Sequence, residues 1–117
     1  MKYMLLMYAS ESEMPNTPEE YQAVAPAWYA FGSEAEAVGV LVSTNGLTRV
    51  ADATTIRVRD GKTQTTDGPF AETHEQLGGY YLLDCKDLDE AIRWAQKIPV
   101  AKYGSVEIRP LNSYSQK

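Results

Sequence analysis

Two segments near opposite ends of the chain, KYMLLMYA at residues 2–9 and GYYLLDC at residues 79–85, are apolar at nearly every position. Short apolar runs rich in aromatic and branched residues predict β-strands. A strand with one face in water alternates apolar and polar side chains, whereas these two segments are apolar on both faces. The fold must therefore cover both sides of its central strands.

A helix is predicted after the first of these strands. TPEE at residues 17–20 has the cap, proline and glutamate of a helix start. Apolar side chains then recur at helical spacing until Gly39, which is expected to end the helix. Pro26 lies within this pattern and is expected to kink or split the helix near Gln22.

The rest of the chain predicts four more strands and a second helix. Asp87 is a natural cap for that helix and Pro99 a natural stop, while Trp94 falls off its apolar stripe and is expected at a partly exposed rim. Asp60-Gly61 is a two-residue hairpin signal. The expected strands cover residues 40–42, 54–59, 62–66 and 105–111.

Without the hairpin, this order is βαββαβ, the ferredoxin-like plan of the α+β class, with both helices on one face of an antiparallel sheet. Two helices cover only one face, so a second copy of the same sheet is the economical cover for the other. We therefore predict a ferredoxin-like fold with an inserted β-hairpin, assembled as a homodimer. One domain is expected over residues 1–112, followed by a polar tail at 113–117.

Composition excludes several classes of function. Sixteen acidic against eleven basic residues give a net charge of −5, which argues against nucleic acid or anionic membrane as a partner. The longest apolar run is too short to span a bilayer, and no signal-peptide pattern follows it, so a cytoplasmic protein is predicted. One cysteine and one histidine are too few ligands for a typical metal site, and neither a metal nor a cofactor is predicted.

The segment TTDGPFAETHEQLGGYY at residues 65–81 carries most of the special chemistry. Asp67, Gly68 and the proline after them form a turn, in which the Asp67 carboxylate is expected to accept main-chain hydrogen bonds. Phe70 is then a core plug that holds the loop down. In the alternative interpretation, Asp67 faces a pocket as a base or hydrogen-bond acceptor and Phe70 lines that pocket.

The neighbouring polar residues also allow two interpretations. Glu72 and His74 face together only if the segment is extended, and a solvated loop histidine is the simpler interpretation. Gly78-Gly79 lacks the following helix of a phosphate loop, so it serves a tight turn or leaves room for a ligand or another chain. Cys85 is expected to be a small buried residue rather than a nucleophile.

The run DGPFAET at residues 67–73, with EQLGGYY at 75–81, resembles the signature of the DGPF proteins of the YCII-related superfamily. The resemblance extends to the opening KYMLLMY and covers nearly the whole chain. It implies a dimeric α/β barrel in which two sheets pack face to face. Some members lie beside extracytoplasmic-function sigma factors, and enzyme-like relatives use a His–Asp pair, among them a dehydrochlorinase.

This chain departs from those enzyme-like relatives. Their histidine lies in the first helix, where Trp28 stands here, and His74 stands where DGPF proteins usually have lysine. We therefore predict a protein that binds a small molecule of unknown identity, with a cofactor-independent hydrolase or lyase activity left open. The alternative is a regulatory partner in a sigma-factor system. The catalytic candidates are Asp67 and His74, and the predicted pocket residues are Tyr8, Trp28, Asp67, Gly68, Phe70, Glu72 and Tyr81.

Overall fold

The computed structural model describes residues 1–114 of the 117-residue chain. The end of the predicted tail, residues 115–117, lies outside the described residues. Along the chain the elements are β1 (Lys2–Ala9), η1 (Glu11–Glu13), α1 (Pro18–Val38), β2 (Leu41–Gly46), η2 (Val50–Asp52), β3 (Thr54–Arg59), β4 (Lys62–Asp67), β5 (Gln76–Asp84), α2 (Leu88–Lys97), η3 (Pro99–Lys102) and β6 (Ser105–Pro110).

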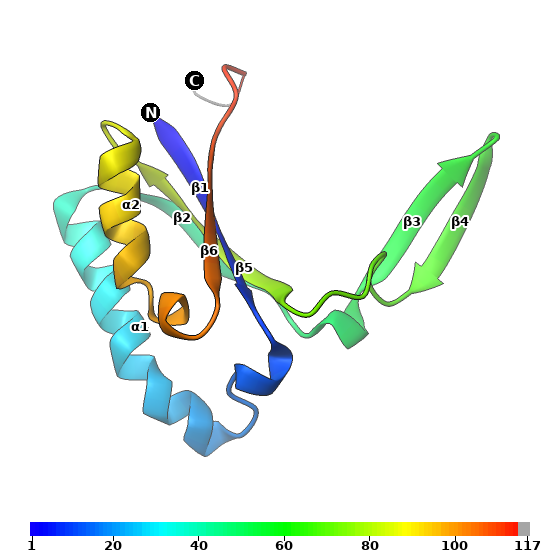
Figure 1. Cartoon of the computed structure of the whole chain (residues 1–117), viewed down its shortest axis with the longest axis horizontal. Coiled ribbons are helices and arrows are strands. Elements are labelled where there is room, and N and C mark those ends of the chain that lie inside the picture. The colour runs from blue at the N-terminus through cyan, green and yellow to red at the C-terminus, as the bar shows by residue number, and fades with distance from the viewer. Residues whose placement is uncertain (115–117) are drawn as a thin grey trace.

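Four of the strands form one antiparallel sheet in the order β2-β5-β1-β6. Both helices pack on the same face of this sheet (Figure 1). This is the ferredoxin-like α+β arrangement that the order of elements predicts. β5 begins at Gln76, three residues earlier than predicted, and β2 extends to Gly46.

Strand alternation divides the sheet into two faces with different surroundings. Alternate residues of β1, such as Leu5, point toward the helices and are buried together with Tyr81 and Leu83 of β5. The opposite side of β1 and β5, here called the open face, carries half-buried side chains. The open face consists of Met4, Leu6, Tyr8, Tyr80 and Leu82. Within the described residues, only the helix side of the sheet has a cover.

Helix α1 starts and ends as its local sequence predicts. The Thr17 hydroxyl oxygen accepts a hydrogen bond from the Glu20 N–H at 3.2 Å, and Gly39 closes the helix with a φ of 90°. The predicted split at Pro26 is wrong, because α1 continues unbroken through this residue. Pro26 lies on the exposed side of α1, where water can bind the Gln22 carbonyl that loses its helical partner.

Helix α2 is capped by Asp87, whose carboxylate accepts a hydrogen bond from the Glu90 N–H at 2.9 Å. The expected exposure of Trp94 is wrong, because only 7% of its surface is accessible. Phe31 of α1 packs edge-on against its ring with centroids 5.9 Å apart, and the Lys97 ammonium lies 5.0 Å from the ring centroid. Helix α1 thus covers the side of α2 that carries Trp94. The spacing of apolar residues within α2 cannot predict this contact, because it depends on another helix.

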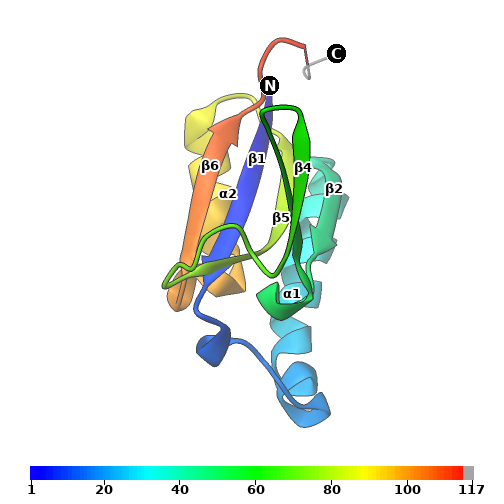
Figure 2. The ribbon, with the colours of Figure 1, turned by 90° about the vertical axis from the view of Figure 1, so that its right-hand side faces the viewer.

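Strands β3 and β4 form a separate two-stranded hairpin, here called the arm, over residues 54–67. Its turn uses Asp60 and Gly61 with φ values of 52° and 74°, which are both left-handed as a two-residue hairpin turn requires. The arm projects away from the sheet and helices (Figure 1). In the view turned by 90°, it passes in front of the sheet on the side opposite the helices (Figure 2).

Candidate functional site

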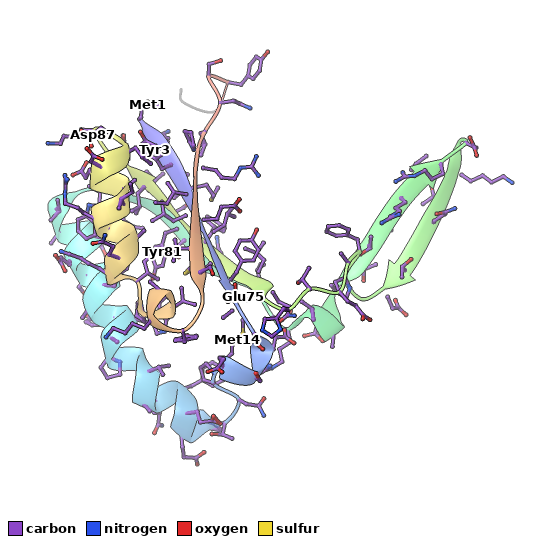
Figure 3. The ribbon with its side chains drawn as sticks, viewed as in Figure 1. Met1, Tyr3, Met14, Glu75, Tyr81 and Asp87 are labelled. Carbon is purple, nitrogen blue, oxygen red and sulfur yellow. The ribbon has the colours of Figure 1, made fainter. Side chains whose placement is uncertain are left out.

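A cavity of about 470 Å³ lies between the first half of α1 and the lower end of the sheet. Figure 3 shows Tyr81 on the helix side of the sheet and Met14 near the foot of β1, beside η1. We call this space the α1 cavity. Its wall consists of Met7, Ala9, Met14, Pro15, Tyr21, Val24, Ala25, Trp28, Thr44, Asn45, Gly46, Leu47, Gly78, Tyr81, Val100 and Tyr103.

Two aromatic rings dominate this wall. Trp28 of α1 and Tyr81 of β5 lie nearly parallel, with an interplanar angle of 9° and ring centroids 6.4 Å apart. Behind them, Phe31 packs edge-on against Tyr81 at 4.8 Å and joins the pair to the core. Edge-on and offset parallel contacts are the favoured arrangements of aromatic rings. The two rings are therefore held in fixed orientations by the packed core beneath them.

Arg49 joins two segments that contribute to the cavity wall. Its guanidinium donates hydrogen bonds to the carbonyl oxygens of Glu11 and Pro15 at 3.3 and 3.2 Å, and to the side chain of Asn16 at 3.2 Å. In return, the Glu11 carboxylate accepts a hydrogen bond from the N–H of Val50 at 2.9 Å. These bonds tie the segment that carries Met14 to the segment after β2. This part of the cavity wall is therefore held by hydrogen bonds as well as by apolar packing.

Gly78 leaves space on the floor of the cavity. Neither Gly78 nor Gly79 has a positive φ, so the pair does not serve a tight turn. A Cβ at Gly78 would lie 3.3 Å from the Met14 methyl group, whereas one at Gly79 would lie 2.7 Å from the Asn45 carbonyl oxygen of β2. Gly78 thus keeps the cavity open, and Gly79 lets the β2 main chain approach β5.

The cavity wall is polar at a few points and carries no charged side chain. Burial raises the pKa of Tyr81, although the neighbouring Thr44 side chain opposes this shift. Burial also raises the pKa of Tyr103, and the negative charge of Glu13 adds to the effect. Both phenols are therefore neutral hydrogen-bonding groups at physiological pH.

Only two of the predicted pocket residues, Trp28 and Tyr81, line the α1 cavity. Tyr8 lies on the open face, where its hydroxyl donates a hydrogen bond to the Glu107 carboxylate at 3.3 Å. Burial, followed by the Glu107 charge, raises the pKa of Tyr8. Of the other four predicted residues, Asp67 ends β4, and Gly68, Phe70 and Glu72 lie in the connection between the arm and β5. Their part in ligand binding stays a prediction.

The turn after the arm is held differently from the predicted Asp67 cap. Asp67 is exposed, and within residues 1–114 its carboxylate has no hydrogen-bond partner. Gly68, with a φ of 101°, donates its N–H to the Ala53 carbonyl at 2.6 Å. The Thr55 hydroxyl donates to the Gly68 carbonyl at 2.8 Å. The Ala53 carbonyl and the Thr55 hydroxyl thus hold this turn without the Asp67 side chain.

The interpretation of Phe70 as a core plug is also wrong for the single chain, because 75% of its surface is exposed. His74 and Glu72 lie in irregular, exposed chain. Within residues 1–114, no group of three or more histidine, cysteine, aspartate or glutamate side chains is arranged to hold a metal ion. No helix in this range is long and apolar enough to cross a membrane.

Sequence reasoning missed most of the cavity wall. Met14 and Tyr103 come from short segments outside the predicted strands and helices, and both reach the cavity because η3, which precedes Tyr103, packs beside β1. One feature of the sequence could have indicated the cavity: the apolar stripe of α1 begins well before the part of the helix that packs on the sheet. Val24 and Trp28 belong to that stripe and remain half-buried, which marks a helix face with space in front of it.

The chain matches the family model of the YCII-related domain over residues 1–114. It belongs to the YCII-related family. An uncharacterised protein of Rhizobium meliloti (strain 1021) is 39% identical to this YCII-related protein over an alignment of 117 positions, which covers 97% of this chain and 94% of that protein.

A solved structure extends the comparison to the fold. The 5-chloro-2-hydroxyhydroquinone dehydrochlorinase of Burkholderia phenoliruptrix AC1100, in complex with 2,5-dihydroxybenzoquinone, superposes with a TM-score of 0.53. The alignment covers 96% of this chain and 94% of that chain, at 10% sequence identity. At this identity the likeness concerns the fold alone, and it agrees with the ferredoxin-like α+β arrangement of the YCII-related protein.

Proposed function

We propose that this YCII-related protein binds a small, uncharged, ring-containing molecule in the α1 cavity. The observation that carries the proposal is the wall itself, which combines the rings of Trp28 and Tyr81 with apolar side chains and no charge. A volume of about 470 Å³ lies within the range typical of small-molecule sites. Burying a charged group there would cost several kcal/mol with no opposite charge to offset it.

The polar groups of the wall suit oxygen-bearing substituents on such a ring. The Tyr81 and Tyr103 hydroxyls can each donate a hydrogen bond to a carbonyl or hydroxyl oxygen and accept one in return. Because the pKa of each phenol is raised, neither serves as a base at neutral pH. The wall therefore supports binding rather than proton-transfer catalysis.

Two further arguments favour a ligand. The dehydrochlorinase with the same fold was solved with a dihydroxylated quinone, which belongs to this class of oxygen-bearing rings. In addition, a regulatory protein that uses its fold only for protein contacts is expected to have this space filled by side chains. The α1 cavity is open instead, with neutral polar groups in its wall, which supports ligand binding over the sigma-factor alternative.

Hydroquinone is a suitable neutral probe, and 4-hydroxybenzoate is its charged counterpart with the same ring. We expect hydroquinone to bind at least tenfold more tightly than 4-hydroxybenzoate at pH 7, because only the latter brings an unpaired charge into the wall. Calorimetric titration of both compounds measures the ratio. Equal affinities, or a preference for the carboxylate, would contradict the proposal.

Substitution of Trp28 locates the site. Trp28→Leu removes the stacking surface and keeps an apolar side chain, so hydroquinone binding should weaken on the order of tenfold. Tyr29→Ala is the matched control, since Tyr29 is the adjacent aromatic residue of α1, is 77% exposed and lies outside the cavity wall. Circular dichroism checks that both variants fold. A Trp28→Leu protein that binds hydroquinone like the parent would rule out this cavity.

We also propose that two copies pack through their open faces. The open face presents Met4, Leu6 and Leu82 at its centre, with Tyr8 and Tyr80 beside them. Contiguous exposed apolar side chains on a soluble protein mark interaction sites. A two-fold axis that lies along the surface of the open face would place each open face against its counterpart and form the barrel that the resemblance to DGPF proteins implies.

A further inference from the structure

The arm is amphipathic, although no other element within residues 1–114 covers it. Its register pairs Ile56 with Thr65 and Val58 with Thr63, so these four side chains share one face of the ribbon. The other face carries Arg57, Arg59, Lys62 and Gln64. Ile56 and Val58 are 56% and 58% exposed. A lone two-stranded ribbon is marginally stable in water. The apolar face of this hairpin therefore indicates that another surface packs against it.

The single chain exposes more surface and is more extended than a compact monomer of its size. It exposes 8010 Å², whereas a compact monomer of 13.0 kDa exposes about 6,300 Å². Its radius of gyration is 16.1 Å, against about 13 Å for a compact domain of this length. The 8010 Å² of the chain exceeds the expected surface by about 1,700 Å², which is as much surface as an obligate dimer buries on each partner.

The position of the arm indicates what covers it. Figures 1 and 2 show the arm on the side of the sheet opposite the helices, the same side as the open face. Both carry apolar side chains that no other element within residues 1–114 fully covers. A second sheet seated on the open face would lie within reach of the arm.

Charge also favours a second copy as the occupant. The arm holds three basic and two acidic residues, which leaves a net charge of −6 on the rest of a chain whose total is −5. Helix α1 alone carries Glu19, Glu20, Glu34 and Glu36 with no basic residue. The net positive arm of one copy is therefore attracted to the acidic body of a second copy, while the basic side chains themselves stay on the outer face of the arm.

We propose that the arm is a dimerisation element that reaches around a second copy of the chain and packs Ile56 and Val58 against it. The inference rests on the dimer proposed above, and it adds a second, separate interface to the contact between open faces. Two-fold symmetry gives each dimer two such arms, one from each copy. Phe70, at the base of the arm and 75% exposed, extends the apolar surface that the partner covers.

The test compares dimer dissociation constants by sedimentation equilibrium. Ile56→Ser combined with Val58→Ser removes the apolar face and should raise the dissociation constant at least tenfold. The control is Gln64→Ser combined with Thr66→Ser, two substitutions on the opposite face of the same ribbon, which should change it less than twofold. Circular dichroism should show the parent fold in both variants, because the arm lies apart from the core.

Hydrogen exchange provides a second measurement on the unmodified protein. Amides of the β3–β4 ladder should be protected in the dimer and should exchange faster on dilution below the dissociation constant. If the parent is a dimer and the Ile56→Ser, Val58→Ser variant has the same dissociation constant, the proposed role of the arm is wrong. The proposed dimer through the open faces would then still hold. A parent that stays monomeric would overturn both, and neither outcome touches ligand binding in the α1 cavity.

Discussion

At the scale of single residues, burial decides what Cys85 can do. Cys85 directly follows β5, and only 1% of its surface is exposed. Burial, together with the nearby carboxylates of Glu90 and Asp84, raises the pKa of the Cys85 thiol to about 11 from an ordinary value of 9.0. The thiolate is the nucleophilic form of cysteine. Cys85 is therefore inert at physiological pH, as expected of a small buried residue.

The raised pKa of Cys85 predicts a pH dependence of stability. Between pH 9 and about 11, the unfolded chain loses the thiol proton while the folded chain keeps it. The free energy of unfolding therefore falls as pH rises through this window, and the contribution is fully present below pH 9. Urea unfolding at pH 8 and pH 10.5 should show a smaller fall for Cys85→Ala than for the parent. Equal falls in the two proteins would contradict the assignment.

At the scale of elements, the pairing of β2 with β5 depends on Gly79. A Cβ there would lie 2.7 Å from the Asn45 carbonyl oxygen and 3.2 Å from the Gly46 Cα, both main-chain atoms of β2. Gly79→Ala must therefore displace a strand, and we expect a loss of about 1–3 kcal/mol in the free energy of unfolding.

Gly78→Ala is the neighbouring control for this prediction. Its new Cβ would meet only the flexible Met14 methyl group, at 3.3 Å. That substitution should change stability by less than about 1 kcal/mol, as changes that displace no backbone usually do. Chemical denaturation of the two variants measures the difference. If Gly78→Ala proved as damaging as Gly79→Ala, close approach of β2 would not be the reason for the second glycine.

Elements were predictable from sequence where their cause is local. The Thr17 and Asp87 caps, the Gly39 helix end and the Asp60-Gly61 turn depend on a few adjacent residues, and the structure contains each of them. Trp94 and Phe70 were misplaced because their exposure depends on segments distant in sequence. The α1 cavity was predicted only through Trp28 and Tyr81, since its wall outside α1 and β5 comes from four separate segments: β1, residues 14–15, residues 44–47 and residues 100–103.

At the scale of the whole molecule, the chain is flat, with extents of 47 × 42 × 19 Å. One face of its sheet carries the helices and the other stays open (Figure 1). A three-layer arrangement of helices, sheet and a second sheet would remove this asymmetry. The apolar run of β1, which first required a cover on both faces, thereby obtains one from its own chain and one from the proposed partner.

Leu6 lies near the centre of the open face, opposite Tyr80 in the strand register, and is the place to test this assembly. Leu6→Asp would bury two unpaired carboxylates across a two-fold axis, so we expect at least a hundredfold rise in the dimer dissociation constant, about 2.7 kcal/mol. Tyr29→Asp introduces the same charge on the exposed surface of α1 and should leave the dimer intact. Sedimentation at low micromolar concentration separates the outcomes. A Leu6→Asp protein that remains as dimeric as Tyr29→Asp would place the interface elsewhere on the molecule.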